Sequence, residues 1–220
     1  MPTFPFGLLI FIFLLTSFSI LVELSAIKIA LDKMGLSTES ATLLFTLSLL
    51  GSMINLPIKR IQSRATVPVT PPPWLKGLLR FPIAEFRGQT TIAINVGGGL
   101  LPLWFSIYLL IYHSPGLIEV VIATALMTAI CYQFSRPLHG LGIGMPVFVA
   151  PLSAALIALT ISSDNTATLA YISATLGVII GADLLRIKDI RQMGTPLASI
   201  GGAGTFDGIY ISGLVAVLLT

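Results

Sequence analysis

Residues 115–134 read PGLIEVVIATALMTAICYQF, and the only charged side chain among them is Glu119. About 20 predominantly apolar residues are the length that a helix needs to cross the hydrocarbon of a bilayer. The whole chain of 220 residues has the same character, with 55% hydrophobic and 10% charged residues. A soluble domain carries roughly 25% charged residues. The composition therefore predicts an integral membrane protein, and it excludes a disulfide scaffold and a nucleic-acid binder.

Similar apolar stretches lie on both sides of this segment. They predict one all-α membrane domain over residues 1–220, a polytopic bundle of about seven spans. A long link over residues 58–88 separates the second and third spans, and its prolines predict an extended cytoplasmic piece followed by a short interfacial helix that begins at Trp74. The predicted spans are 6–27, 41–57, 89–112, 115–134, 141–161, 166–185 and 196–220.

The basic residues between the spans predict the orientation. Ten of the twelve lysines and arginines fall on one side of the predicted bundle, and only Lys28 and Lys33 fall on the other. Cytoplasmic loops carry an excess of Lys and Arg. We therefore expect the N-terminus in the cytoplasm and the C-terminus on the far side of the membrane.

Four acidic residues, Glu23, Glu119, Asp183 and Asp207, lie within the predicted spans. Ionisable groups are costly in a bilayer and mark functional sites there. Glu23 and Glu119 lie near span ends, where their carboxyl groups reach the headgroups. Asp183 and Asp207 both fall in the cytoplasmic half of consecutive antiparallel spans, so they are able to face each other. Two carboxyl groups in one poorly solvated site share a proton, which is what aspartyl hydrolysis needs.

Two other interpretations of these acids stay open. In the first, Asp183 pairs locally with Arg186 or Lys188, while Asp207 caps a half-helix. In the second, the two carboxyl groups form the proton or ion site of a carrier. The residue types and their depth in the predicted spans are compatible with each of these.

Glycines surround the second acid. Gly-rich clusters in a span either permit close helix packing or unwind the helix at membrane depth. We expect the glycines near Asp207 to admit a substrate backbone, and we expect Gly-broken helices at spans three and seven. The stretch AINVGGG at 93–99 is echoed by ASIGGAG at 198–204, and paired broken helices are typical of transporters. The predicted substrate-binding glycines are Gly201, Gly202, Gly204 and Gly208.

These motifs carry two family resemblances. GAD at 181–183, GGAGTFDG at 201–208 and NVGGG at 95–99 resemble a family of small prokaryotic membrane proteins, the domain of unknown function numbered sixteen-fourteen. That resemblance implies a membrane fold in a prokaryotic inner membrane and no assigned activity. More distantly, the two acids and the glycines are similar to the di-aspartyl intramembrane proteases of the presenilin group. The spacing between the glycines and Asp207 is two residues longer here than in those proteases.

The leading hypothesis is a membrane-embedded di-aspartyl hydrolase, an intramembrane aspartyl protease with Asp183 and Asp207 as catalytic residues. Its partners would be the lipid bilayer and a membrane-protein or peptide substrate. A proton-coupled or cation-coupled carrier of small solutes and a non-catalytic membrane partner protein are the alternatives. No metal or cofactor is expected, since Cys131, His113 and His139 are isolated in the sequence. The oligomeric state stays open.

Overall fold

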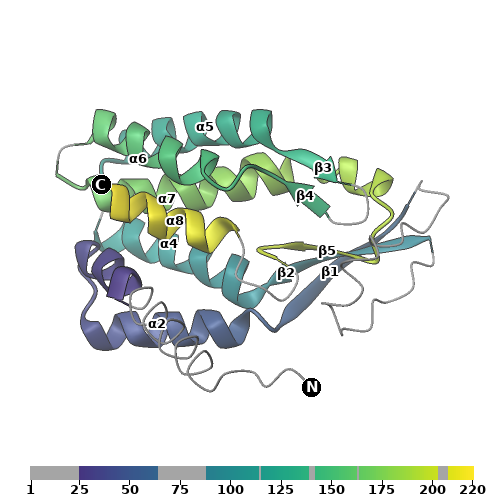
Figure 1. The fold of residues 1–220 in the computed structure, drawn as a ribbon, viewed down its shortest axis with the longest axis horizontal. Coiled ribbons are helices and arrows are strands. Elements are labelled where there is room, and N and C mark those ends of the chain that lie inside the picture. The colour runs from purple at the N-terminus through teal and green to yellow at the C-terminus, as the bar shows by residue number, and fades with distance from the viewer. Residues whose placement is uncertain (1–24, 64–87, 114, 139–141, 163, 203–207) are drawn as a thin grey trace, which may run out of the picture.

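Helices that run lengthwise through the molecule form most of the fold, and a small sheet extends from one end of them (Figure 1). The computed structural model describes residues 25–63, 88–113, 115–138, 142–162, 164–202 and 208–220. A helical segment over 25–33 precedes the named helices. These are α2 (Thr38–Gly51), α4 (Leu101–Tyr112), α5 (Leu117–Phe134), α6 (Val149–Ile161), α7 (Thr166–Val178) and α8 (Gly208–Leu219).

Three shorter helical pieces extend or connect these helices. The π-helical turn η1 (Val96–Leu100) leads directly into α4, and the π-helical turn η2 (Ile179–Leu184) continues α7. The 3-10 turn η3 (Asp189–Gln192) follows η2. Since π-helical turns recur at functional sites, η2 and its Asp183 are of particular interest.

Two small sheets complete the fold. The larger sheet has the order β1-β2-β5 and contains β1 (Asn55–Gln62), β2 (Gln89–Asn95) and β5 (Leu197–Ile200). β1 pairs antiparallel with β2, with a bulge next to Pro57, whereas β5 pairs with β2 in parallel. Proline is tolerated at edge strands and bulges. The smaller sheet is the hairpin of β3 (Arg136–Leu138) and β4 (Gly142–Gly144).

The strands correct the prediction of an all-α fold. The predicted spans that start at residues 89, 141 and 196 all begin as strands, and the predicted span 41–57 ends in β1. The break expected in span three is therefore the junction of β2 with η1, and span seven contains a strand, β5, before its helix α8. In β2 the run Thr90, Thr91, Ile92 is rich in the β-branched residues that favour strands.

Two helices in the described part are long and apolar enough to cross a membrane, namely Leu117–Phe134 and Thr166–Leu184. They lie within the predicted spans 115–134 and 166–185. Two more apolar helices, Val96–Tyr112 and Val149–Ile161, are shorter. The count of seven spans is not confirmed. Most of the predicted first span and of the link 58–88, including its interfacial helix, lies outside the described residues.

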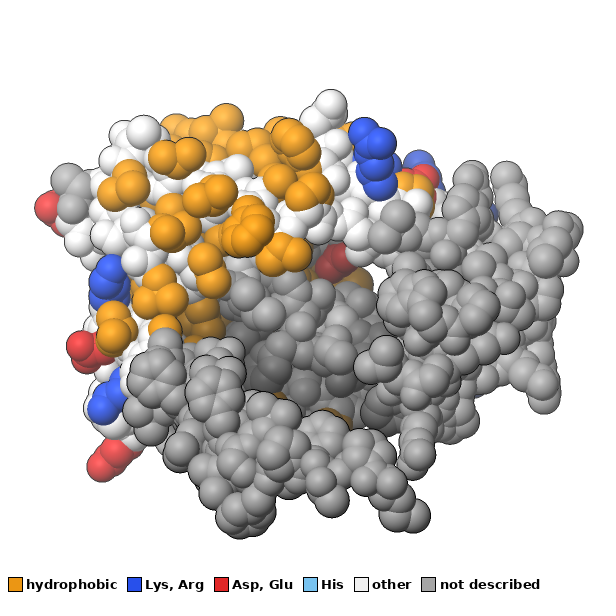
Figure 2. Space-filling model, in the orientation of Figure 1, with side chains coloured by type: hydrophobic (Ala, Val, Ile, Leu, Met, Phe, Trp, Pro, Cys, Tyr) orange, Lys and Arg blue, Asp and Glu red, His pale blue; other side chains and the backbone are white. Residues whose placement is uncertain are grey.

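Small side chains fill the interior, and large apolar side chains cover the outside. In α6 the buried face carries Ala150, Ala154 and Ala158, whereas Leu156 on the opposite face is 63% exposed. In α5, Ile118 is 75% exposed. Figure 2 shows hydrophobic side chains spread over the helices, with Lys and Arg at both ends of this region. Small residues at helix interfaces and large apolar residues outside are typical of helices packed in lipid.

α7 is the central helix of the bundle. Almost all its residues are buried, and it packs against α4, α5, α6 and α8. The ring of Tyr171 meets the ring of Phe105 edge-on, with centroids 5.1 Å apart. Because α7 ends in η2, the central position of this helix also determines where Asp183 lies.

Candidate functional site

Two glycines bring the end of α7 very close to α5. A β-carbon at Gly177 would collide with Met127, and one at Gly181 would collide with the carbonyl oxygen of Thr128 and lie 2.9 Å from Cβ of Cys131. Close backbone approach of this kind is the usual role of glycine between membrane helices. It places η2, which contains Asp183, directly against α5.

Asp183 is half-buried in this contact. Its Oδ2 atom is shielded from solvent, and its carboxyl group lies close enough to the thiol of Cys131 to interact with it electrostatically. Cys131 itself is fully buried. Asp183 therefore has one carboxylate oxygen inside the contact between η2 and α5 and lies beside a buried thiol.

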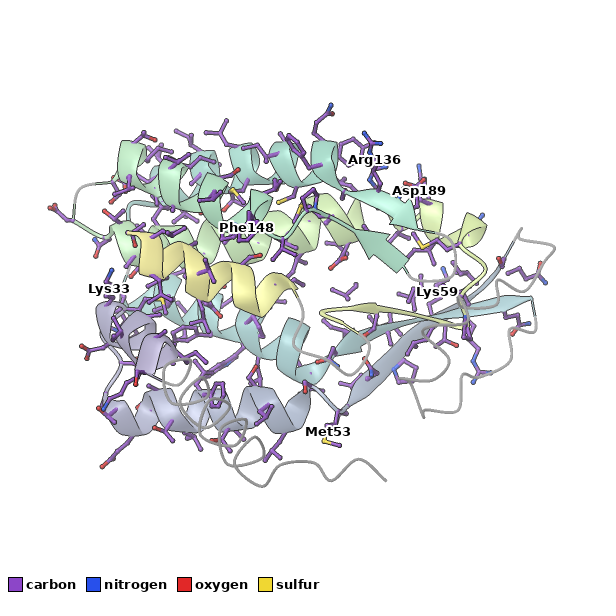
Figure 3. All side chains as sticks on the ribbon, in the orientation of Figure 1. Lys33, Met53, Lys59, Arg136, Phe148 and Asp189 are labelled. Atoms are coloured by element: carbon purple, nitrogen blue, oxygen red, sulfur yellow. The ribbon has the colours of Figure 1, made fainter. Side chains whose placement is uncertain are left out.

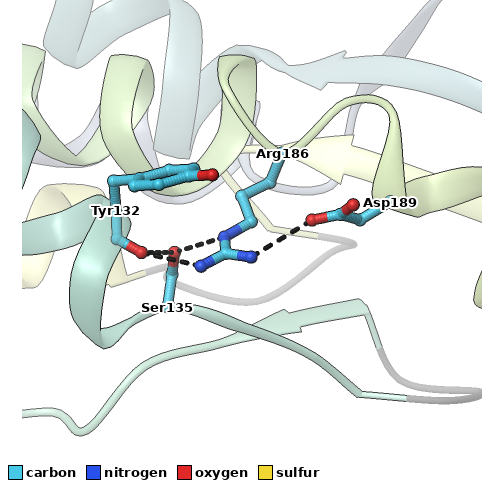
Figure 4. A network of polar contacts seen from close by, with 4 residues as sticks. All are labelled: Tyr132, Ser135, Arg186 and Asp189. Atoms are coloured by element: carbon cyan, nitrogen blue, oxygen red, sulfur yellow. Dashed lines mark hydrogen bonds and ion pairs between the residues drawn. The ribbon is translucent and has the colours of Figure 1, made fainter.

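Arg186 connects the end of η2 with the end of α5 (Figure 4). It donates from Nε to Oγ of Ser135 at 3.1 Å and from Nη2 to the carbonyl oxygen of Tyr132 at 2.8 Å. Its guanidinium group also lies over the Tyr132 ring, 4.5 Å from the centroid. Its Nη1 atom also forms a salt bridge with Oδ2 of Asp189 at 3.2 Å. The arginine that was a candidate partner of Asp183 is therefore engaged with Asp189.

A second polar centre lies at the ends of β2 and β5. Asn95 is completely buried at the end of β2. Its Nδ2 donates to the carbonyl oxygen of Ser52 at 2.6 Å and to Oδ1 of Asn55 at 3.2 Å, while its Oδ1 accepts from the N–H of Gly98 at 2.8 Å. Oγ of Ser199 in β5 donates to the same Oδ1 of Asn55 at 2.6 Å. Asn95, Asn55 and Ser199 thus tie the three strands together.

Glycines from both strand ends meet beside this polar centre. Gly201 and Gly202 have φ angles of +83° and +89°, which favour glycine. A β-carbon at Gly201 would collide with the backbone of Gly98 and Gly99. The two glycine clusters that the sequence suggested as related therefore lie in contact. We call Asn55, Asn95, Ser199, Gly97–Gly99 and Gly201–Gly202 the glycine junction.

The pairing of the two clusters differs by one residue from the sequence echo. The echo aligns Ala93 with Ala198, whereas the parallel register pairs Ala93 with Ser199 and Ile94 with Ile200. The two similar stretches therefore lie side by side in the fold, but they pair as parallel strands and not as broken helices.

The predicted site residues are only partly described. Asp183, Gly201 and Gly202 have the positions given above, and Gly208 is the first residue of α8. Asp207 and Gly204 lie outside the described residues, so the pairing of the two acids stays a prediction. Sequence reasoning missed Asn95 and Asn55. The signal for Asn95 was an amide inside an apolar run, immediately before Val96 and three glycines.

Within the part of the chain that the structure describes, no group of three or more His, Cys, Asp or Glu side chains is placed to hold a metal ion.

Comparison with known proteins gives the family of this chain. The fold and polar sites of the chain define a mostly helical protein, in which a bundle of apolar helices carries a small sheet at one end. A family model described as a protein of unknown function (DUF1614) matches residues 49–219, and the chain belongs to this family, as its motifs predicted. No curated protein and no solved structure matches it.

Proposed function

We propose that this chain is an integral membrane protein and that Asp183 and Asp207 form the acid pair of an intramembrane aspartyl protease. The observation that carries this proposal is the register of α7 against α8. These helices lie side by side and run in opposite directions (Figure 1). A β-carbon at Gly213 would lie 2.9 Å from the Tyr171 ring and 3.2 Å from Oγ1 of Thr175.

This contact sets the level at which α8 begins. Gly208 lies five residues before Gly213, so in the antiparallel arrangement it is level with the end of α7, near Val178. With a rise of about 1.5 Å per residue, Asp183 lies roughly one to one and a half helical turns farther along. Asp207 is bonded to Gly208. The register therefore supports a pair in which the two carboxyl groups come from adjacent helix ends, offset by roughly one helical turn along the axis.

The chemistry follows from that pair. One ionised carboxylate takes a proton from water, and the water oxygen attacks the carbonyl carbon of the scissile peptide bond. The other carboxyl group, protonated, donates to the carbonyl oxygen. When the C–N bond breaks, a carboxyl group passes the proton to the leaving amine. The shielding of Oδ2 of Asp183 supports this role, because low solvation favours one shared proton over two ionised groups.

The surface of the bundle supports the membrane location. Large exposed apolar residues on α4, α5 and α6 form the faces that would contact lipid. Lys33 lies at one end of the molecule, while Lys59 and Arg136 lie at the other (Figure 3). By the positive-inside rule the end with Lys59 is cytoplasmic, and the C-terminus then lies on the far side. A prokaryotic inner membrane is the location we propose.

The protease proposal is tested with purified protein in liposomes and a set of synthetic single-span peptides, with cleavage read by mass spectrometry. We expect cleavage without any ion gradient. Asp183→Asn and Asp207→Asn should each lower the rate by 100-fold or more, as is usual for loss of a general acid or base. The control is Asp32→Asn, at an exposed acid elsewhere. Full cleavage by the Asp207→Asn protein would overturn the proposal.

A carrier is the second candidate, and the glycine junction favours it. Two strand–glycine–helix units, β2–η1–α4 and β5–α8, meet in parallel at a buried polar centre, and helices interrupted in corresponding places form the substrate sites of many transporters. Uptake of a labelled solute or cation into the same liposomes, dependent on pH or membrane potential and lost in the Asn variants, would indicate this function. The third alternative is a non-catalytic membrane partner protein. It is favoured if the wild-type protein shows neither cleavage nor uptake and if the variant with both Asp183→Asn and Asp207→Asn keeps normal expression and normal binding to its protein partner.

A further inference from the structure

A pocket with a basic rim opens between the sheet and the segment that follows η2. Its volume is about 420 Å³, and it is lined by Lys59, Ile61, Ile92, Ile187, Lys188, Asp189 and Arg191. Ligand pockets commonly have volumes of about 300–1,000 Å³. We call this space the basic pocket.

The charges around the basic pocket are unbalanced. Lys59, Lys188 and Arg191 are exposed at its rim, and among the described residues they form no salt bridge. The single acidic residue of the lining, Asp189, already pairs with Arg186 at 3.2 Å. The pocket therefore presents three cations against one carboxylate whose charge is largely compensated, and it should attract a ligand with a negative group.

The floor of the basic pocket is apolar. Ile92 is buried, and it packs with Ile190 and Met193 in a small core against which Ile61 and Ile187 also lie. A fixed floor of this kind holds the rim residues in place, because β1, β2 and the segment 187–191 are joined through it. Oγ of Ser63 also donates to the carbonyl oxygen of Arg191 at 2.9 Å, which links the end of β1 to the same segment.

The position of the pocket suggests the source of the anion. Lys59 and Asp189 lie at the same end of the molecule as Arg136, opposite Lys33 (Figure 3). By the positive-inside rule this end faces the cytoplasmic leaflet, which carries anionic phospholipids. Basic pockets between membrane helices on the cytoplasmic side bind the headgroups of anionic lipids, and the basic pocket offers the same combination of cations and apolar side chains between the sheet and residues 187–191.

We propose that the basic pocket binds the phosphate-bearing headgroup of an anionic phospholipid, with Lys59, Lys188 and Arg191 around the phosphate and the isoleucines against the apolar part of the lipid. This inference rests on the membrane location proposed above but not on the acid pair. It would give the sheet, which projects from the helices, a fixed attachment to the leaflet.

The test uses the full chain purified in detergent and native mass spectrometry with phosphatidylglycerol, phosphatidylcholine and inorganic phosphate as separate probes. We expect phosphatidylglycerol to bind more tightly than the other two. Each cation near a membrane surface contributes about 1 kcal/mol, or roughly fivefold in affinity. The pair of changes K59Q and K188Q should therefore weaken phosphatidylglycerol binding on the order of 25-fold.

Matched controls make the result specific. Arg60 follows Lys59 in β1, so by strand alternation its side chain points to the other face of the sheet. Neither Arg60 nor Arg136 lines the basic pocket. R60Q with R136Q removes the same charge and should leave binding within about twofold, since neither side chain lines the pocket that holds the phosphate. K59R with K188R keeps the charge and should retain binding, which separates loss of charge from misfolding.

Two outcomes would overturn the inference. If R60Q with R136Q lowers the affinity for phosphatidylglycerol as much as K59Q with K188Q does, the lipid is attracted by the overall positive charge of this end and not by the basic pocket. Inorganic phosphate binding as tightly as phosphatidylglycerol would make free phosphate the ligand. The protein with both Asp183→Asn and Asp207→Asn should still bind the lipid, so failure of the protease proposal is distinguishable from failure of this one.

Discussion

Single polar residues hold the strands of this protein in register. Asn95 is the clearest case, because its one side chain bonds with Ser52, Asn55 and the N–H of Gly98 while it is completely buried. A buried polar group left without a partner costs about 1–3 kcal/mol. The stability of the glycine junction should therefore depend strongly on this amide.

Replacement of Asn95 by Leu tests this dependence. Leucine has a similar volume but cannot bond with the N–H of Gly98 or the carbonyl oxygen of Ser52, so we expect a clear fall in melting temperature in detergent, equivalent to about 1–3 kcal/mol per unpaired group. The control is Asn165→Leu, since Asn165 is exposed and its side chain makes no capping hydrogen bond. Equal melting temperatures for the two variants would contradict the prediction.

At the scale of elements, the approach of α7 to α5 depends on the absence of side chains. Gly177 and Gly181 are spaced one turn apart, and both face α5 at points where a β-carbon would meet main-chain or β-carbon atoms. Such atoms cannot move aside as the end of a flexible side chain can. The contact therefore brings η2 and Asp183 to a defined position against α5.

Gly177→Ala should separate these two elements. Alanine normally favours a helix by up to about 1 kcal/mol over glycine, but here its β-carbon collides with Met127, and overpacking costs about 1–3 kcal/mol. The expected net effect is a lower melting temperature, measured by thermal denaturation in detergent. In the control Gly116→Ala the new β-carbon would lie 3.5 Å from Glu119, an ordinary contact. A Gly177→Ala protein as stable as the wild type would show that the helices adjust freely.

At the scale of the whole molecule, the distribution of charge separates two ends. Lys33 and Arg136 lie at opposite ends of the helical bundle (Figure 3), and large apolar side chains cover the surface between them. In a soluble protein such a surface would be exposed to water over most of its area. Within a bilayer the same surface is the favourable one.

Single-cysteine labelling tests the membrane topology. In a Cys131→Ala background, which removes the chain's one cysteine, we expect Lys33→Cys to react with an impermeant maleimide in right-side-out vesicles. Arg136→Cys should react only after permeabilisation, because the bilayer separates the two ends. Reaction of both cysteines in sealed vesicles would contradict the proposed orientation and the membrane location with it.

Features that depend on local composition could be predicted from the sequence alone. The run 117–134 and the run 166–184 are helices long and apolar enough to cross a membrane, as their residue content predicted. Lys33 lies at the opposite end of the molecule from Lys59 and Arg136 (Figure 3), which agrees with the sides on which the sequence placed these three cations. Membership of the DUF1614 family followed from short motifs.

Features that depend on partners far away in the sequence could not be predicted and appear only in the folded chain. Residues 89–95 and 197–200 are apolar enough to resemble the starts of helices, but each becomes a strand because the other supplies its hydrogen-bonding partner about a hundred residues away. Asn55 and Asn95 gain their importance in the same way, since their bonds join separate strands. Arg186 is engaged with Asp189 and the end of α5 because the fold brings that helix end to it. Local patterns specify helix length and polarity, whereas strand pairing and polar networks are specified by contacts that exist only once the chain has folded.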